Sequence, residues 1–463
     1  MTTLPPGPRL PTLLQTWMFW GSRNRMLRRL RDRFGPTFTV RVVPGGTLVY
    51  VTDPADVKTV FTGDPDVFRA GEANAVLRPV MGPSSVLCTD QPDHLAQRKR
   101  MLPAFHGAAV ESYVDIVGAA TEASMDDWPI ATPFAVLPRM QAVTLEVILR
   151  AVIGVEDDEE RLDPLRTTLR SLATISPAVM LMWIRPELQR VGPWRRYARV
   201  KARADDLLFA EIARRRAAPD LHERTDVLSM LMRGDGPEAG MTDQELRDQL
   251  VTLLLAGHET TATGLAWALE RLVRHPQVMK NLRKSLASGD ESYLSAVVSE
   301  TLRVRPVIHD VARVLHAPVT IGGYELPAGV TVVPSIGLVH SRDDVFPHAD
   351  DFWPERFLDQ RPGTYEWFPF GGGIRRCLGA PFAIAEMKTV LRAVLERFDV
   401  QAARPEPEPI RMHHITFIPA RGAQLIARPL SASVEREPKL VAAKSPRAAQ
   451  DSQASPRPGG VPR

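Results

Sequence analysis

The pattern of apolar and polar positions along the chain predicts a protein built mainly from helices. Helical periodicity dominates from about Asp90 to His275. Two stretches have the pattern of strands instead: residues 37–52, in which two β-prone runs flank a Pro-Gly-Gly turn, and residues from about 312 to 334. Asp53 is placed to cap a short helix. The expected fold class is therefore mainly α with minor β.

The longest predicted helix begins at Thr242 and ends near His275. Thr242 and Glu245 match a capping box, and Pro276 marks the boundary at the other end. At ~1.5 Å per residue this helix is about 50 Å long, enough to cross a large domain. Its middle is apolar on most faces, which indicates that it is buried.

The segment AGHETT, residues 256–261, interrupts this apolar helix. Gly257 costs ~1 kcal/mol relative to alanine in a helix interior, and Glu259 is a carboxylate in an apolar run. Thr260 and Thr261 can hydrogen-bond back to helix carbonyls and bend the helix. The residues alone leave two interpretations open: a tolerated kink with Glu259 facing solvent, or a functional opening.

Residues 370–379, FGGGIRRCLG, place Cys377 behind three consecutive glycines. Glycine removes Cβ atoms and allows positive φ, which leaves room around a thiolate, and amides of such a loop can hydrogen-bond the sulfur. Arg375 and Arg376 favour the deprotonated thiol and can pair with cofactor carboxylates. A helix predicted over 380–398 begins beside the sulfur and adds to this effect. The loop predicts a metal-binding thiolate, and a buried cysteine in a glycine-rich loop is the plainer alternative.

This string fits the F-x-x-G-x-R-x-C-x-G signature of the cytochrome P-450 family, so the chain resembles soluble bacterial haem-thiolate monooxygenases. The resemblance implies the cytochrome P-450 fold, with haem b (iron protoporphyrin IX) between a long distal helix and the proximal helix that follows the cysteine loop. It implies that Cys377 is the axial haem iron ligand, whose thiolate favours O–O cleavage. Further haem contacts implied in this way are Phe370, Gly371, Gly379 and Ala256.

The distal helix adds a second match. AGHETT resembles the family's A/G-G-x-D/E-T segment over the distal haem face. The resemblance implies that the hydroxyl of Thr260 steadies dioxygen there and that Glu259 delivers protons through water, a general-acid role.

Haem propionates need cationic or donor partners. His94 and Arg98 are four residues apart and share a helix face, which matches the family's H-x-x-x-R pattern. Arg313 and Arg375 occupy the other two positions where the family usually has propionate arginines. Taken alone, each of these residues is as consistent with a solvated surface charge as with a propionate contact.

Glu300 and Arg303 lie one helical turn apart, and such a pair is usually an exposed salt bridge of small energy. Arg356, in PERF, lies 21 residues before Cys377, where the family has the second arginine of a Glu–Arg–Arg network. The resemblance therefore assigns these three residues to maintenance of the fold behind the cysteine loop.

The cysteine content and the length of the apolar runs indicate the cellular compartment of the protein. Cys88 and Cys377 are its two cysteines; they do not suggest a disulfide framework and fit a reducing cytosol. Cys88 is expected to be a buried small hydrophobe. The apolar run from Leu13 to Trp20 is too short to span a bilayer. We expect a soluble cytoplasmic protein, a monomer without a transmembrane anchor.

Charge and composition also set the expected domain boundary. The formal net charge is +4, but residues 431–463 hold six basic and three acidic residues, which account for three of these charges. Nucleic-acid binding has no support from this balance. The tail, rich in Ser, Pro, Ala and Arg, cannot offset the cost of ordering. We expect a single haem domain over 1–430 and a disordered tail over 431–463.

The function implied by the resemblance is a monooxygenase that activates O2 and inserts one oxygen atom into an organic substrate by hydroxylation or epoxidation. NAD(P)H electrons would arrive through a separate ferredoxin and ferredoxin reductase, docking on a basic proximal surface. That surface comprises Arg98, Lys99, Arg100, Arg375, Arg376 and Lys388.

A lipophilic substrate is expected, because one of the candidate pocket segments is strongly apolar and rich in methionine. The candidate segments are Phe68–Leu87, Leu172–Ile184 and Val307–Val311. The alternatives are a peroxide-driven peroxygenase on the same fold and a haem-binding sensor or carrier without turnover.

Overall fold

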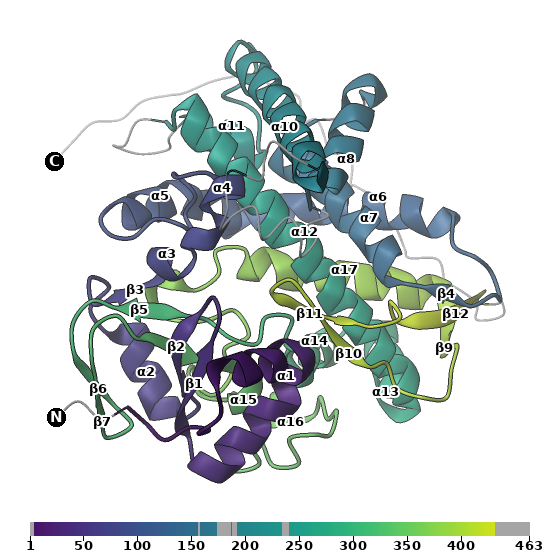
Figure 1. Ribbon diagram of the computed structural model, residues 1–463. Helices are drawn as coiled ribbons and strands as arrows, with labels where there is room; N and C mark the ends of the chain where they lie inside the picture. Colours follow the sequence, from purple (N-terminus) through teal and green to yellow (C-terminus); the bar gives the residue numbers. More distant parts are fainter. Residues whose placement is uncertain (1–3, 156–157, 174–186, 188–191, 234–239, 431–463) are drawn as a thin grey trace, which may run out of the picture. The chain divides into compact units, whose positions relative to one another are not determined.

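The computed structural model describes residues 4–155, 158–173, 187, 192–233 and 240–430. The chain up to Pro429 forms one unit of helices with small sheets (Figure 1). The helices are α1 (Thr12–Phe34), α2 (Pro54–Thr62), α3 (Ala70–Ala73), α4 (Arg78–Met81), α5 (Asp93–Met101), α6 (Ala108–Asp126), α7 (Leu137–Val147), α8 (Glu159–Ala173), α10 (Gly192–Arg216), α11 (Val227–Arg233), α12 (Asp243–Arg274), α13 (Pro276–Ala287), α14 (Ser292–Val304), α15 (Ile336–Val339), α16 (Arg356–Asp359) and α17 (Ala380–Arg397). Short 3-10 and π segments are η1 (Ala75–Leu77), η2 (Leu102–Phe105), η3 (Ile148–Val152) and η5 (Gly373–Arg375).

The strands form small sheets. They are β1 (Thr37–Val42), β2 (Gly46–Val51), β3 (Phe68–Arg69), β4 (Phe134–Ala135), β5 (Arg313–Leu315), β6 (Val319–Ile321), β7 (Tyr324–Leu326), β8 (Thr331–Pro334), β9 (Phe398–Ala402), β10 (Ile410–His413), β11 (Thr416–Pro419) and β12 (Gln424–Pro429). The largest sheet has the order β1-β2-β8-β5-β3, and a second has the order β4-β12-β9. Two hairpins, β6-β7 and β10-β11, stand apart from these sheets. The mainly α fold with minor β is therefore confirmed.

The first sheet follows the sequence pattern. Strands β1 and β2 pair antiparallel, with Val42 opposite Gly46 across the Pro-Gly-Gly turn. The carboxylate of Asp53 accepts a hydrogen bond from the amide of Ala55 and so caps α2. Strand β8 pairs with β2 in parallel, from Leu48 opposite Thr331 to Val51 opposite Pro334. The predicted β-rich region after residue 310 thereby becomes part of the N-terminal sheet.

Helix α12 runs diagonally through the middle of Figure 1, with the N-terminal sheet at the lower left and α8, α10 and α11 above. The hydroxyl of Thr242 and the side chain of Glu245 form the predicted capping box, and the helix ends at His275 as expected. Helices α7 and α17 pack against α12. At Gly264 the approach to α17 is so close that a Cβ atom would lie 3.2 Å from the sulfur of Met387.

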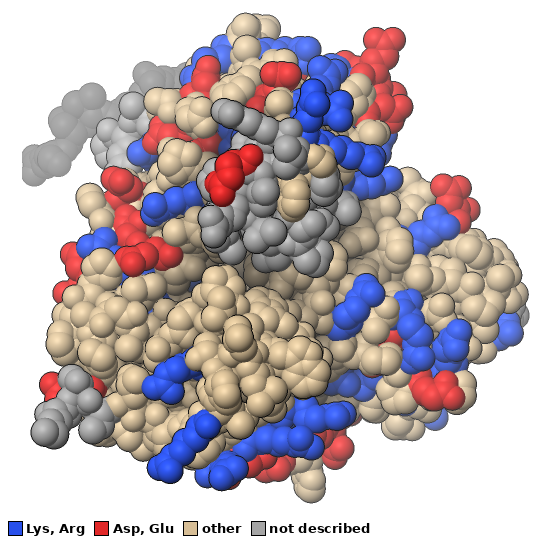
Figure 2. All heavy atoms as spheres, viewed as in Figure 1, with Lys and Arg blue, Asp and Glu red and all other residues tan. Residues whose placement is uncertain are grey.

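Figure 2 shows mostly uncharged side chains over the N-terminal sheet on this face, and basic side chains along its lower edge near α1. Helix α1 is rich in arginine over residues 23–33. In the described part of the chain, the helices lack an apolar stretch long enough to cross a bilayer. The tail predicted to be disordered lies outside the described residues, and so does most of the candidate pocket segment Leu172–Ile184.

Candidate active site

The cysteine loop is held against α2. The amide of Cys377 donates to the carbonyl of Phe370 at 2.9 Å, which closes the loop. Gly371 and Gly373 have φ of +68° and +64°, which side chains rarely adopt. A Cβ atom at Gly373 would lie 2.0 Å from the carbonyl oxygen of Phe61. Glycine is therefore required here both by the backbone conformation and by the packing.

The sulfur of Cys377 lies next to the start of α17. Burial raises the pKa of the thiol, while the amides of Gly379 and Ala380 and the guanidinium groups of Arg98 and Arg376 act in the opposite direction. The side chain is nevertheless accessible. An accessible sulfur among dense protein atoms is what a ligand-facing thiol requires. Cys88, in contrast, is buried, as expected for a small core residue.

The four residues predicted to hold propionates come together. His94 is buried, and its pKa is lowered to about 3 by burial and by the nearby charges of Arg375, Arg98 and Arg313. Burial and Arg375 lower the pKa of Arg313 to about 10. Burial also lowers the pKa of Arg375 to about 10, although Asp90 opposes the shift. The cluster therefore concentrates positive charge in the interior of the protein.

Protein groups satisfy this cluster only in part. Arg375 donates to the carbonyl of Thr89 at 2.5 Å and to the carboxylate of Asp90 at 2.7 Å. Arg98 donates to the carbonyl of Arg376 at 2.7 Å. The Nδ1 atom of His94 is buried, and no described residue hydrogen-bonds it. A ligand that carries carboxylates would offset the surplus charge and give His94 a partner, so these residues fit the propionates of haem.

The middle of the distal helix is most accessible where the sequence is unusual. In the middle of α12 Ala256 is exposed, and Gly257, Glu259 and Thr260 are half-buried, whereas most of the helix on either side is buried. Thr260 donates its hydroxyl proton to the carbonyl of Ala256 at 2.5 Å, while Thr261 is buried. The side chain of Thr260 therefore belongs to the accessible stretch and that of Thr261 to the core.

Glu259 does not face bulk solvent as the kink interpretation expected. Its Oε1 atom accepts hydrogen bonds from Nδ1 of His413 at 2.6 Å and from the hydroxyl of Thr416 at 2.9 Å. Burial would raise the pKa of Glu259, but hydrogen bonds from His413, His414 and Thr416 outweigh it and bring the pKa down to about 2. Figure 1 shows their hairpin, β10-β11, beside the middle of α12. The sequence alone does not identify these partners, because nothing local links residue 413 to residue 259.

Glu300, Arg303 and Arg356 form one buried network. Arg303 contacts both carboxylate oxygens of Glu300, at 2.7 and 2.8 Å, and Arg356 contacts the same carboxylate at 3.2 Å. The side chains of Glu300 and Arg303 are 0% exposed, so this is not the exposed pair that spacing alone suggested. Arg303 also donates to the carbonyls of His340 and Ala349 and so ties α14 to the segment that precedes the cysteine loop.

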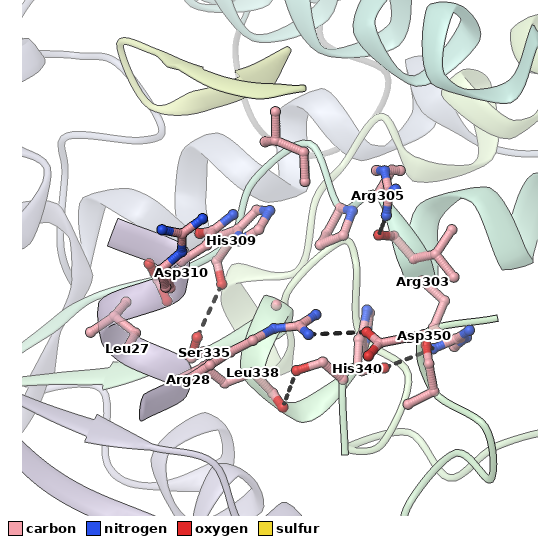
Figure 3. Close-up of a pocket in the computed structure, with 18 residues that line it drawn as sticks. Leu27, Arg28, Arg303, Arg305, His309, Asp310, Ser335, Leu338, His340 and Asp350 are labelled. Carbon is pink, nitrogen blue, oxygen red and sulfur yellow. Dashed lines mark hydrogen bonds and ion pairs between the residues drawn. The ribbon is translucent and has the colours of Figure 1, made fainter. Parts of the chain in front are cut away.

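A cavity of about 360 Å³ lies elsewhere in the same unit (Figure 3). Its lining includes Arg28 and Asp350, which form an ion pair at 3.0 Å, together with Arg305 and His309. None of the residues predicted to contact haem lines it, but it shares Arg303 with the predicted network and His309 and Asp310 with the candidate pocket segment Val307–Val311. The cavity is therefore separate from the cysteine loop and the cationic cluster.

The candidate pocket segment Val307–Val311 lies against β11. The amide of Phe417 donates to the carbonyl of Val307 at 2.9 Å, and Ile308 forms an isolated bridge with Thr416. This segment and the partners of Glu259 therefore belong to one local assembly. The other candidate segment, Phe68–Leu87, contains the exposed apolar side chain of Val76.

Comparisons with known proteins identify the family of the chain. The family model described as Cytochrome P450 matches residues 3–426. A putative cytochrome P450 135B1 of Mycobacterium tuberculosis is 46% identical over 432 residues, covering 92% of this chain and 91% of the relative. A putative cytochrome P450 137 of the same species is 42% identical over 414 residues, covering 88% of this chain and 86% of the relative.

Solved structures show the same fold at lower identity. The retinoic acid bound cyanobacterial CYP120A1 has a TM-score of 0.80 and 22% identity, covering 93% of this chain and 100% of its own. The haem domain of cytochrome P450DA has a TM-score of 0.81 and 23% identity, covering 93% of this chain and 98% of its own. Because the family model matches nearly the whole chain and relatives are up to 46% identical over most of it, the chain belongs to the cytochrome P450 family.

Proposed function

We propose that this cytochrome P450 is a monooxygenase that takes electrons from a separate redox partner and inserts one oxygen atom into a lipophilic substrate. The observation that carries the proposal is the pairing of two features. One is the accessible thiol of Cys377 beside a buried cationic cluster, and the other is an accessible stretch of α12 that bears Glu259 and Thr260.

Each residue has a role in this proposal. Cys377 ligates the haem iron, and the bound haem supplies the dioxygen chemistry of the reaction. His94, Arg98, Arg313 and Arg375 hold the propionates, since their charge is offset only in part within the protein. Phe370, Gly371, Gly379 and Ala256 line the haem faces.

The distal residues supply protons. Thr260 holds a proton at its hydroxyl, which now points back to the carbonyl of Ala256. Glu259 relays protons from water. Because its carboxylate is bound by His413 and Thr416, Glu259 must leave or share these hydrogen bonds when it acts.

The electron donor we propose is a ferredoxin supplied by a ferredoxin reductase. The basic surface expected for it is smaller than the sequence suggested. Lys99 and Arg376 are exposed, but Arg375 points inward to Asp90, and Lys388 forms an ion pair with Glu291. An acidic partner would therefore be steered mainly by Lys99 and Arg376.

A lipophilic substrate is supported by apolar side chains left exposed in a candidate pocket segment and in the hairpin that binds Glu259. Val76 is 43% exposed, and Ile415, between the partners of Glu259, is 54% exposed. Candidate ligands can be ranked by the shift of the Soret band when they displace iron-bound water. If polar ligands alone produce a shift, the lipophilic assignment is wrong.

The reaction class is tested by comparing two ways of driving it. The haem-loaded protein is assayed with NADH, ferredoxin and reductase, and separately with hydrogen peroxide. We expect product with the electron-transfer chain. Efficient turnover with peroxide alone would favour a peroxygenase, and ligand binding without product under either condition would favour a sensor or carrier.

A matched pair of variants tests the distal role. Thr260→Ala should lower the product formed per NADH oxidised and raise hydrogen peroxide release, while haem binding persists. Thr261→Ala is the control, because Thr261 is buried away from the accessible stretch. If only Thr261→Ala uncouples turnover, the residue assignment on α12 is wrong by one position.

A further inference from the structure

A second group of metal-binding side chains lies beside the distal helix. Glu259, His413 and His414 each offer one ligand atom, and these atoms all lie within 4.8 Å of one another. Two imidazoles and one carboxylate are a donor set that suits Zn²⁺ and neighbouring first-row ions. We propose that these three residues form a divalent transition-metal site, distinct from the haem, and that a bound Zn²⁺ withdraws Glu259 from proton delivery.

The backbone of the β10-β11 hairpin brings the two histidines to one side. Adjacent residues of a strand normally point to opposite faces. His414, however, lies in the turn after β10 and has φ of +57°, in the left-handed region that a residue other than glycine seldom adopts. The imidazole rings of His413 and His414 consequently lie 3.8 Å apart between centroids. Such conformations often occur at functional sites.

The distances suit a tetrahedral ion after small shifts. Nδ1 of His413 lies 2.6 Å from Oε1 of Glu259, and Nδ1 of His414 lies 3.9 Å from Oε2. With zinc–ligand distances of about 2.0–2.2 Å, tetrahedral ligand atoms lie roughly 3.4 Å apart. With one ligand atom from each residue, all three atoms lie within 4.8 Å of one another, so each separation must change by about 1.4 Å or less, which side-chain rotation can supply.

The outer contacts and exposure also fit a metal site. The hydroxyl of Thr416 donates to Oε1 of Glu259 at 2.9 Å, which orients the carboxylate. The His413 side chain is 38% exposed and that of His414 is 8% exposed, so an ion can enter from solvent on the His413 side. Three protein ligands leave a fourth position for water.

The effect on turnover rests on the proposed function. A bound ion would hold both histidines and Glu259 together and keep the carboxylate from relaying protons. Zinc should therefore slow product formation while leaving ligation of the haem iron by Cys377 unchanged. Metal binding itself does not require turnover, so the two parts of the proposal can fail separately.

The binding experiment uses the untagged, haem-loaded chain, freed of metal ions by a chelator that leaves haem bound, and titrated with ZnCl2 by calorimetry. We expect one saturable site. His414→Ala should weaken zinc binding by more than 100-fold, whereas Thr416→Val, which removes an outer contact, should weaken it by roughly 10–100-fold. An unchanged haem spectrum checks that each variant is folded.

His316→Ala is the matched control. His316 pairs with Glu72 in an exposed histidine–carboxylate contact that is not part of this group of three ligands. Its loss should leave zinc affinity unchanged. If zinc does not bind, or binds equally to wild type and to the His413→Ala/His414→Ala double variant, the site does not exist.

Turnover is then measured with and without zinc at a saturating concentration. We expect zinc to lower product formation in the wild type and to have little effect on the double variant, each compared with its own zinc-free rate. Stoichiometric zinc binding without inhibition would support the metal site and contradict the role of Glu259 in proton delivery.

Discussion

Glu386 and Glu259 are both carboxyl groups on helices that cross the core, but their pKa values move in opposite directions. Burial raises the pKa of Glu386 to about 8, and its Oε1 atom has no hydrogen-bond partner among the described residues. The pKa of Glu259 falls to about 2 because hydrogen bonds from His413, His414 and Thr416 outweigh burial. At the residue scale, burial acts on both carboxyl groups, and the presence of hydrogen-bond donors decides which of them is charged.

The raised pKa of Glu386 predicts a pH-dependent stability. The folded protein binds a proton more tightly than the unfolded chain, so this contribution is complete below pH 4.5 and is lost as pH rises to about 8. Its contribution to the free energy of unfolding should fall by ~1.4 kcal/mol per pH unit across this range. In urea titrations the difference in stability between Glu386→Gln and wild type should therefore change with pH, whereas the difference between Glu396→Gln, at an exposed position of the same helix, and wild type should stay constant. Parallel curves for Glu386→Gln and wild type would contradict the assignment.

The two cysteines predict opposite outcomes. Cys377→Ala should abolish the long-wavelength absorption band of the reduced, carbon-monoxide-bound protein, because that band requires thiolate ligation. Cys88 is buried and its sulfur contacts the carbonyl of Asn74, so Cys88→Ala should leave the band unchanged. If the band survives in Cys377→Ala, Cys377 is not the ligand of the haem iron.

At the scale of elements, the Glu300–Arg303–Arg356 network joins α14 to the segment before the cysteine loop. Arg303 reaches the carbonyls of His340, Ala349 and Asp351 in addition to Glu300. Backbone carbonyls of an irregular segment need partners when they are buried, and one guanidinium supplies three of them. The network therefore fixes a segment that neither a helix nor a sheet holds in place.

Removing Arg303 should consequently be costly. Arg303→Met leaves the buried carboxylate of Glu300 with only Arg356 and one amide, and we expect a loss of about 3–5 kcal/mol in the free energy of unfolding, with loss of haem. Arg28→Met breaks the exposed pair with Asp350 and should cost about 1 kcal/mol or less. Equal losses in the two variants, measured by urea unfolding, would show that the network does not stabilise the fold.

At the scale of the whole molecule, the last strand of the described chain is β12. This strand pairs with β9 from Leu425 to Pro429 and with β4 at Gln424 and Leu425, so the last described residues belong to a sheet. The domain boundary near residue 430 remains a prediction from composition. It places the end of the haem domain directly after this strand.

Deleting Ser431 to Arg463 should therefore change neither the haem content nor the Tm. The pairing of β12 stays intact, and the deleted residues include no aromatic side chain. A longer deletion from Gln424 is the control, because it removes β12 and should lower both. A drop in Tm of several degrees after the shorter deletion would mean that the tail packs on the domain.

Some features were determined by the sequence because short-range rules govern them. The capping box at Thr242, the cap at Asp53 and the β1-β2 hairpin each depend on residues a few positions apart. The glycine-rich run around Cys377 likewise carries its own backbone requirement. Such signals predicted the helical fold, the boundaries of α12 and the family.

Other features were decided by tertiary structure alone. Glu259 and His413 are 154 positions apart, and only the return of the β10-β11 hairpin to α12 turns a carboxylate in an apolar run into a bound, charged group. Similarly, packing and not sequence turned Arg375 inward to Asp90, although Arg375 and Arg376 are adjacent and look equivalent in the chain. Periodicity and spacing report which face of an element a residue occupies. They do not report which distant element covers that face, and the charge of a buried group depends on that partner.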